Sequence, residues 1–222
     1  MDSMIKLKKE AIKRAAQVFT PGQDSSVVIA SYDDWSQTYE QSLGDGRYRS
    51  HIIAAEEVTR MVPKERRQLV RVLDVAAGTG WVGRELHKNG FTNMDALEPS
   101  TGMMNILKDS GIYKIKYQEL IGVGENTVPQ DTYDVVVISG GMGDGHVPVS
   151  GIDDMIRFAK PGGLVIIVMR LEFVSTAEVF KDKLEPYMDH LEQEGKWRKE
   201  ARKVVPNYFL DKDGVVFTYR VQ

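Results

Sequence analysis

The stretch Val72-Leu73-Asp74-Val75-Ala76-Ala77-Gly78-Thr79-Gly80 decides the fold of this 222-residue chain. It closes a β-branched and apolar run, residues 69–76, which predicts a strand buried on both faces. Glycines follow the run, and a helical pattern then extends to Asn89, with Gly90 as the predicted C-terminal cap. A strand that passes through a glycine turn into a helix is the starting unit of an α/β fold.

The alternation of strand and helix patterns continues toward the C-terminus. We expect strands at 93–97, 114–121, 134–139 and 164–171, helices at 100–109 and 152–159, and a turn at 160–163. On the N-terminal side, residues 49–62 carry apolar side chains at helical spacing, and Pro63 ends that pattern. This order predicts a mostly parallel sheet with helices on both faces.

The last part of the chain departs from this alternation. A long helix at 176–194, with a kink at Pro186, is predicted to precede a stretch from residue 197 to 209. Residues 211–214 resemble a tight hairpin loop that leads into a strand at 215–221. We therefore expect an α/β, Rossmann-like three-layer sandwich whose seven-stranded, mostly parallel sheet ends in an antiparallel hairpin. Residues 1–30 would form a helical extension, and residues 31–222 a single domain.

Composition excludes several classes of protein and of site. The chain has no cysteine, which rules out disulfides and thiolate ligands, and its four histidines lack metal-ligand spacing, so we expect no metal. No apolar run approaches the ~20 residues that cross a bilayer, and we expect a cytoplasmic protein without a membrane partner. The formal charge of −3 offers no general attraction to a phosphate backbone, so nucleic acid is not an expected partner.

Residues 1–18 have an amphipathic, lysine-rich pattern. We interpret them as a solvated helix that caps the domain. A transit peptide is the alternative, and the acidic residues Asp2 and Glu10 argue against it.

Two ligand classes compete for the glycine turn. Residues 78–83 satisfy the G-x-G-x-x-G pattern, and Glu98 follows Gly78 by 20 residues, as in a dinucleotide-binding fold. Asp74 argues against a dinucleotide, because a carboxylate inside a strand needs a polar partner and would repel a pyrophosphate. A ligand with an ammonium group and a sulfonium would instead be attracted to the Asp74 carboxylate. The predicted C-terminal hairpin also argues against a dinucleotide-binding fold, because it stands where such a fold would have a further βαβ unit.

Several motifs resemble those of class I S-adenosylmethionine-dependent methyltransferases. The stretch 72–80 is similar to their first motif, with Ala76 where glycine is more usual. Leu97-Glu98-Pro99-Ser100 with Met103-Met104 resembles the second motif. The segments 32–39, 133–136 and 160–164 resemble further family segments, so the likeness covers roughly residues 30–170. Within the family, the stretches at 32–35, 48–49 and 145–148 are most similar to a subgroup of methyltransferase-like proteins.

The resemblance implies S-adenosylmethionine as the methyl donor and S-adenosylhomocysteine as the product. Glu98 is expected to accept both ribose hydroxyls. Gly78 and Gly80 are expected to pass close to the methionyl part. Asp74 would hold the ammonium group directly or through water, with a structural acid as the alternative. Thr79 would donate a hydrogen bond there, with a simple turn role as the alternative.

The adenine end of the expected site departs from the family pattern. Leu120 and Ile121 are expected to sandwich the ring, since Gly122 stands where an acid is common, and Glu119 is the alternative acid. The other cofactor-binding residues that we expect are Ala76, Pro99, Met103, Ser139 and Gly140. A purely core role is the alternative for Met103.

Upstream of the first strand, Tyr32, Trp35 and Tyr39 recur at helical spacing and form one aromatic stripe. We expect this stripe to cover the cofactor and to order on cofactor binding, with core packing as the alternative. His146, in a glycine-rich loop, is a candidate general base, and a merely solvated histidine is the alternative. The predicted activity is methyl transfer to a small molecule or a protein side chain. A catalytically silent fold that binds cofactor or a partner protein is the alternative, and the sequence does not indicate an oligomeric state.

Overall fold

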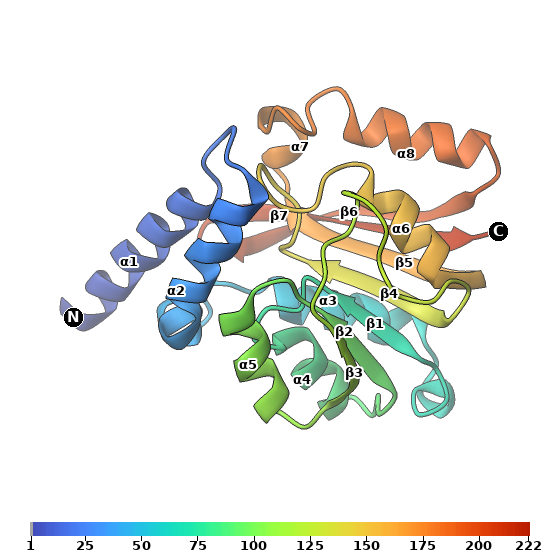
Figure 1. Ribbon diagram of the computed structural model, residues 1–222, viewed down its shortest axis with the longest axis horizontal. Coiled ribbons are helices and arrows are strands. Elements are labelled where there is room, and N and C mark those ends of the chain that lie inside the picture. The colour runs from blue at the N-terminus through green and yellow to red at the C-terminus, as the bar shows by residue number, and fades with distance from the viewer. Residues whose placement is uncertain (1) are drawn as a thin grey trace.

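β1 (Val72–Val75) lies near the middle of a seven-stranded sheet with the order β3-β2-β1-β4-β5-β7-β6 (Figure 1). The structure is a computed structural model that describes residues 2–222. The first five strands are parallel, and β7 runs antiparallel to both of its neighbours. The other strands are β2 (Met94–Leu97), β3 (Tyr113–Tyr117), β4 (Tyr133–Ser139), β5 (Ala159–Arg170), β6 (Trp197–Phe209) and β7 (Lys212–Val221). The predicted mostly parallel sheet with a C-terminal antiparallel pair is therefore confirmed.

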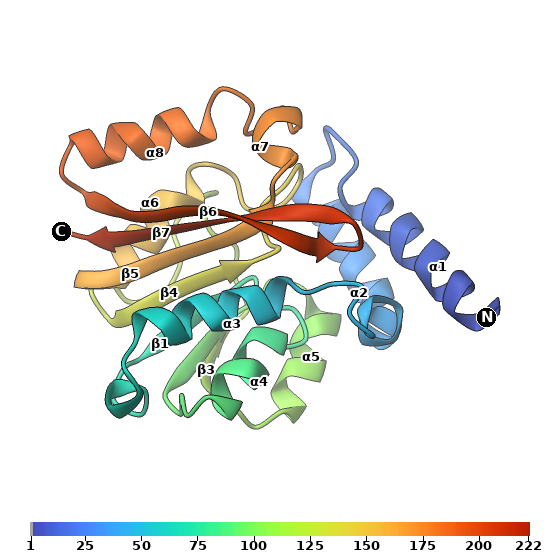
Figure 2. The ribbon, with the colours of Figure 1, turned by 180° about the vertical axis from the view of Figure 1, so that it is seen from behind.

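Helices cover both faces of the sheet and complete three layers (Figures 1 and 2). Side chains of β4 alternate between two cores, with Val135 and Val137 in one and Val136 and Ile138 in the other. The first core includes side chains of α3 (Ser50–Met61) and α4 (Trp81–Lys88). The second includes side chains of α6 (Gly151–Phe158) and α8 (Leu184–Gln193). The remaining helical segments are α1 (Asp2–Val18), α2 (Ser25–Leu43), α5 (Thr101–Asp109), α7 (Phe173–Thr176) and a short 3₁₀ turn at Lys64–Arg66.

The two N-terminal helices lie side by side at one end of the sheet (Figures 1 and 2). The boundary expected at residue 30 falls inside α2. Among residues 2–222, no helix is both long and apolar enough to cross a membrane.

The long helix predicted at 176–194 is wrong. Only α8 lies within this range, because α7 ends at Thr176, and turns occupy most of the residues between the two helices. Pro186 is the third residue of α8, where its missing N–H leaves no intrahelical bond unmade. Its ring would clash with a helical carbonyl at residue 182, and Asp182 instead adopts a positive φ of 55°. The proline therefore lies in the first turn of a helix and does not kink one.

The hairpin loop predicted at 211–214 is misplaced. The turn is formed by Leu210 and Asp211, because Phe209 already pairs with Lys212. Gly214 lies inside β7, opposite Arg170 of β5. A Cβ on Gly214 would come within 2.7 Å of the Tyr208 ring. This glycine thus makes room for an aromatic side chain and forms no part of the turn.

Two predicted strands are too long. The first strand begins at Val72, since Leu69 lies in a turn and is 72% exposed. The strand predicted at 114–121 ends at Tyr117, because its neighbour β2 ends at the paired residue Leu97 and offers no further partner. Residues 118–121 consequently leave the sheet.

Glu57 joins α3 to the hairpin strands from a position that is only 6% exposed. Its carboxylate accepts hydrogen bonds from Thr218 Oγ1 (2.6 Å), Arg60 Nη2 (2.7 Å) and Lys203 Nζ (2.9 Å). Burial acts to raise the pKa of Glu57, but these hydrogen bonds outweigh it and hold the pKa at about 2. The carboxylate therefore stabilises the fold above its unfolded pKa of about 4.3, and this stability is lost as the pH falls toward 2.

We expect Glu57→Gln to lower the free energy of unfolding at pH 7 by ~1–3 kcal/mol, because the buried Thr218 hydroxyl and two more exposed cations lose a charged acceptor. Urea unfolding measures the change, which should shrink between pH 4.5 and pH 3, because Glu57 of the unfolded chain takes up a proton there while Glu57 of the folded chain is still ionised. The neighbouring exposed Glu56 provides the matched control, and Glu56→Gln should leave the unfolding curve unchanged. Equal effects of the two substitutions would contradict this role of Glu57.

Candidate functional site

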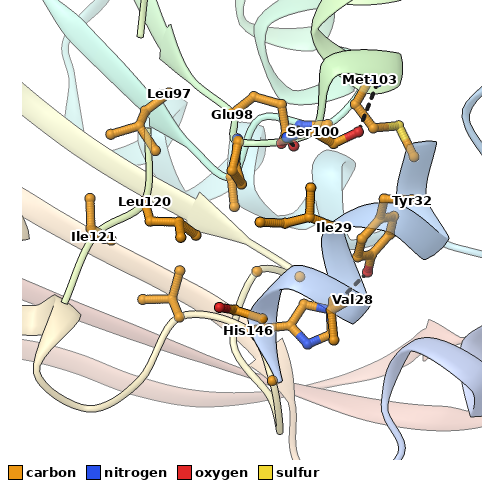
Figure 3. Close-up of a pocket in the computed structure, with 18 of the residues that line it drawn as sticks. Val28, Ile29, Tyr32, Leu97, Glu98, Ser100, Met103, Leu120, Ile121 and His146 are labelled. Atoms are coloured by element: carbon orange, nitrogen blue, oxygen red, sulfur yellow. Dashed lines mark hydrogen bonds between the residues drawn. The ribbon is translucent and has the colours of Figure 1, made fainter. Parts of the chain in front are cut away.

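A cavity opens at the carboxyl ends of β1, β2 and β4. Open α/β sheets bind ligands at this edge. Its floor includes Ala76 and Gly78 after β1, Glu98 and Pro99 after β2, and Ser139 to Gly141 at the end of β4. Residues of α2 and of the loop after β4 face them across the cavity (Figure 3).

The Glu98 carboxylate connects the end of β2 to the glycine turn. One oxygen accepts the Gly78 N–H at 2.8 Å, and the other accepts the Ser100 N–H at 2.8 Å. Glu98 is only 6% exposed, yet it lines the cavity. Burial raises its pKa to about 7 against the lowering effect of the two N–H groups. A carboxylate offers about four acceptor positions, so two remain for a ligand.

Asp74 lies below the turn and does not line the cavity. Its Oδ2 accepts a 2.5 Å hydrogen bond from the Tyr113 hydroxyl, which in turn accepts the Gly83 N–H at 3.0 Å. Burial raises the pKa of Asp74 to about 7, although the Tyr113 hydroxyl acts to lower it. A Cβ on Gly83 would come within 2.2 Å of the Tyr113 hydroxyl, so the third glycine of the G-x-G-x-x-G pattern makes room for tyrosine.

The residue that follows β1 is Ala76, whose φ of +51° lies in the left-handed region that favours glycine. Its methyl group lies close to Gly141, where a Cβ would come within 2.5 Å of the Ala76 Cβ. Ser139, at the end of β4, has a buried hydroxyl without a hydrogen-bond partner among the described residues. The floor therefore combines a strained backbone position with an unpaired polar atom, features that are typical of ligand sites.

Helix α2 is held over the cavity by Asp33. Its Oδ1 accepts hydrogen bonds from Ser100 Oγ (2.6 Å) and from the Gly102 N–H (2.8 Å) at the start of α5. Gly102 permits the close approach, since a Cβ there would come within 2.9 Å of the Asp33 backbone. A negative charge is favourable at a helix N-terminus, so this contact fixes α2 to α5.

Tyr32 and His146 connect α2 to the loop after β4. The His146 Nδ1 lies 2.9 Å from the carbonyl oxygen of Asp144, which can only accept, so Nδ1 carries the proton. The Tyr32 hydroxyl therefore donates to the free Nε2 at 2.9 Å, as the dashed line in Figure 3 indicates. Burial lowers the pKa of His146 to about 4, although the hydrogen bond to the Asp144 carbonyl acts to raise it. His146 is thus neutral and paired, and not a solvated loop residue.

The other end of the cavity is apolar. Leu97, Leu120 and Ile121 line it, and Ile29 of α2 faces Leu120 across the gap (Figure 3). Glu119 also reaches the cavity wall, but both its oxygens are hydrogen-bonded to Thr127 of the same loop. A flat apolar ring fits between such walls.

Most of the predicted site residues lie around this one cavity. It is lined by Tyr32, Tyr39, Ala76, Gly78, Glu98, Pro99, Met103, Leu120, Ile121, Ser139, Gly140 and His146. The structure does not bring Trp35, Asp74, Thr79 or Gly80 to its wall. Trp35 lines a second, adjacent cavity, while Thr79 is buried and Gly80 caps α4.

Sequence reasoning missed Val28 and Ile29 of α2 and Tyr48, which also line the cavity. Val28 and Ile29 precede Tyr32 by four and three residues, so the aromatic stripe could have been extended upstream by helical periodicity. Tyr48 lies between α2 and α3, outside any helical pattern, and its only signal was the resemblance of the stretch 48–49 to a subgroup of the family.

Comparisons with known proteins agree with this geometry. Residues 46–211 match the family described as the methyltransferase domain. Human methyltransferase-like protein 27 is 34% identical over 166 residues, which cover 75% of this chain and 66% of the relative. The demethylmenaquinone methyltransferase of Clavibacter sepedonicus is 29% identical over 66% of this chain and 58% of its own length. This chain thus spans less than two thirds of the length of these relatives.

Solved structures show the same fold at low sequence identity. A methyltransferase from Thermotoga maritima, described as S-adenosylmethionine-dependent, superposes with a TM-score of 0.56 at 18% identity. The match covers 86% of this chain and 98% of that one. The cyclase SpnF superposes with a TM-score of 0.65 at 16% identity and covers 91% of this chain and 98% of that one. The predicted Rossmann-like fold and the resemblance to methyltransferases are confirmed.

Asp33→Ala should loosen α2, because Ser100 and Gly102 lose the carboxylate that holds the helix against α5. We expect faster hydrogen exchange of the amides of α2, measured by mass spectrometry. Asp34→Ala is the matched control, since Asp34 is exposed and its side chain makes no hydrogen bond within the described part of the chain. Unchanged exchange in the Asp33 variant would show that other contacts hold α2.

Proposed function

This chain belongs to the methyltransferase domain family, and on that premise we propose that it binds S-adenosylmethionine in the cavity and is a methyltransferase. The observation that carries the proposal is the Glu98 carboxylate, which lies beside the glycine turn with two acceptor positions left. Two ribose hydroxyls would occupy these positions. This role of Glu98 goes beyond the family assignment, and a substitution of Glu98 tests it directly.

Further residues of the cavity fit the same ligand. The unpaired Ser139 hydroxyl and the backbone of Gly78 and Gly140 would hold the methionyl part. Leu120 and Ile121 would enclose the adenine at the apolar end. We assign Asp74 an indirect role, because it orders the turn through Tyr113 and does not reach the cavity wall.

Bound there, S-adenosylmethionine would supply an activated methyl group that a nucleophilic acceptor atom takes up as the carbon–sulfur bond breaks, leaving S-adenosylhomocysteine. The chain's own residues would mainly align the reactants and exclude water. Tyr32 and Tyr39 of α2 cover the cavity, and the hydrogen bond from Tyr32 to His146 would hold this cover closed. We therefore assign His146 a positioning role through Tyr32.

Glu98→Ala tests the carboxylate directly. We expect calorimetric titration with S-adenosylmethionine or S-adenosylhomocysteine to show a loss of ~1–3 kcal/mol in binding free energy, because two charge-assisted hydrogen bonds are not made. Glu125→Ala, which removes an exposed acid from a nearby loop, should bind both ligands like the wild type. Unchanged affinity in the Glu98 variant would remove this residue from the ligand site.

The raised pKa of Glu98 predicts a pH dependence of binding. Ribose hydroxyls donate to the ionised carboxylate, so a ligand must displace its proton at any pH below about 7. Affinity should therefore rise with pH between 5.5 and 7.5, by at most about tenfold per pH unit for one coupled proton. Calorimetry with S-adenosylhomocysteine at several pH values measures this dependence. The affinity of Glu98→Gln should change less with pH than that of the wild type. An equally steep profile in Glu98→Gln would assign the titration to another group.

A further inference from the structure

Ser100, the residue before α5, connects two carboxylates that come from different parts of the chain. Its backbone N–H donates to Glu98 Oε1 at 2.8 Å, and its hydroxyl donates to Asp33 Oδ1 of α2 at 2.6 Å. The Ser100 hydroxyl oxygen also accepts the Met103 N–H at 3.1 Å and so caps α5 (Figure 3). Ser100 is only 1% exposed, so these contacts are shielded from water. The cavity floor and its cover therefore meet at one buried serine.

We propose that Ser100 is a positioning residue that couples ligand binding at Glu98 to the closure of α2 over the cavity. The proposal rests on the function proposed above, since it takes the ligand to be the adenosyl donor whose ribose Glu98 holds. It goes beyond that function by assigning a residue that acts between the donor and the cover, and by making donor binding and closure depend on each other.

The Glu98 carboxylate is the end of this link that a ligand would change. Burial is the main cause of its raised pKa, and the charge of Asp33 acts in the same direction. The two carboxylates thus repel each other across Ser100 when Glu98 is ionised. Ribose hydroxyls that donate to Glu98 would offset this repulsion and would fix the orientation of the carboxylate. The bound ligand therefore favours the arrangement in which Glu98, Ser100 and Asp33 are all in place.

Asp33 is the end of the link that holds α2. Besides the Ser100 hydroxyl, its Oδ1 accepts the Gly102 N–H at 2.8 Å, so the carboxylate has two contacts with the start of α5. Asp33 is not among the residues that line either cavity. The adjacent residue Tyr32 does line the ligand cavity, and its hydroxyl donates to His146. Asp33 can therefore affect a ligand only indirectly, through Ser100, through α2 or through its charge.

The sign of the effect separates the proposed link from a simple charge effect. A coupling free energy between two sites is the same in both directions, so a substitution that loosens α2 should weaken ligand binding at Glu98. Removal of the Asp33 charge would by itself favour ionised Glu98 and so strengthen binding. Weaker binding after the loss of Asp33 is thus opposite to what its charge alone would cause.

The test is a double-mutant cycle of Asp33→Ala and Ser100→Ala, titrated by calorimetry with S-adenosylhomocysteine at about pH 8. We expect each substitution to weaken binding by about fivefold or more, as is typical of coupled sites. The double variant should bind no more weakly than the weaker-binding single variant, because both substitutions break the same link. Asp34→Ala and Thr101→Ala are the matched controls and should bind like the wild type, since both residues are exposed.

Hydrogen exchange, followed by mass spectrometry, supplies a measurement that a merely structural role of Ser100 would not change. In the wild type, saturating S-adenosylhomocysteine should slow the exchange of the α2 amides. In Ser100→Ala at saturating ligand, this ligand-dependent slowing should be lost. Ser100→Thr keeps the hydroxyl and should restore it.

Four results would overturn the proposal. They are unchanged or tighter binding by Asp33→Ala, additive effects in the double variant, full slowing of α2 exchange in Ser100→Ala, and wild-type α2 exchange that the ligand leaves unchanged. The first and the last do not involve Ser100→Ala, so the test stands even where that variant does not fold. Failure of the wild type to bind either adenosyl ligand would instead refute the proposed function, and the same titrations detect it.

Discussion

The hydrogen bond from the Gly78 N–H to the Glu98 carboxylate is the contact on which the cavity depends. β1 and β2 are parallel neighbours that end level, with Val75 opposite Leu97, so the turn and the acid that follow them meet. The second oxygen of Glu98 accepts the Ser100 N–H and positions the start of α5. One buried carboxylate thereby organises the turn, the helix start and the cavity floor. A buried charge persists only where such donors surround it.

A second buried carboxylate supports the same turn from below. Asp74, Tyr113 and the Gly83 N–H form a continuous chain of hydrogen bonds, which links β1 to β3 and to α4. The third glycine of the G-x-G-x-x-G pattern is thus explained by the tyrosine that lies against it. Because this explanation involves no pyrophosphate, the pattern by itself does not indicate a dinucleotide. The residues around the turn, and not its glycine pattern, therefore distinguish a dinucleotide site from an S-adenosylmethionine site.

The cover of the cavity comes from a part of the chain far from the sheet in sequence. Asp33 binds the start of α5, and Tyr32 donates to His146 in the loop after β4. These two adjacent residues attach α2 at both sides of the cavity. The same helix contributes Tyr32 and Tyr39 to the wall shared with the second cavity. The position of α2 therefore determines the shape of both.

Local patterns in the sequence were enough to predict most of the order of the elements, the parallel sheet with its antiparallel end, and the two acids near the glycine turn. These features follow from local periodicity, from glycine spacing and from the fact that parallel strands end at one edge. Local patterns did not determine that Asp74 faces Tyr113, that Leu210 turns the hairpin, or that residues 177–183 interrupt a helix. Those outcomes depend on partners remote in the chain, or on the competition between local helical pattern and proline geometry. The pairing of Tyr32 with His146 likewise depended on tertiary packing alone, because two segments that are 114 residues apart in the chain must meet before it exists.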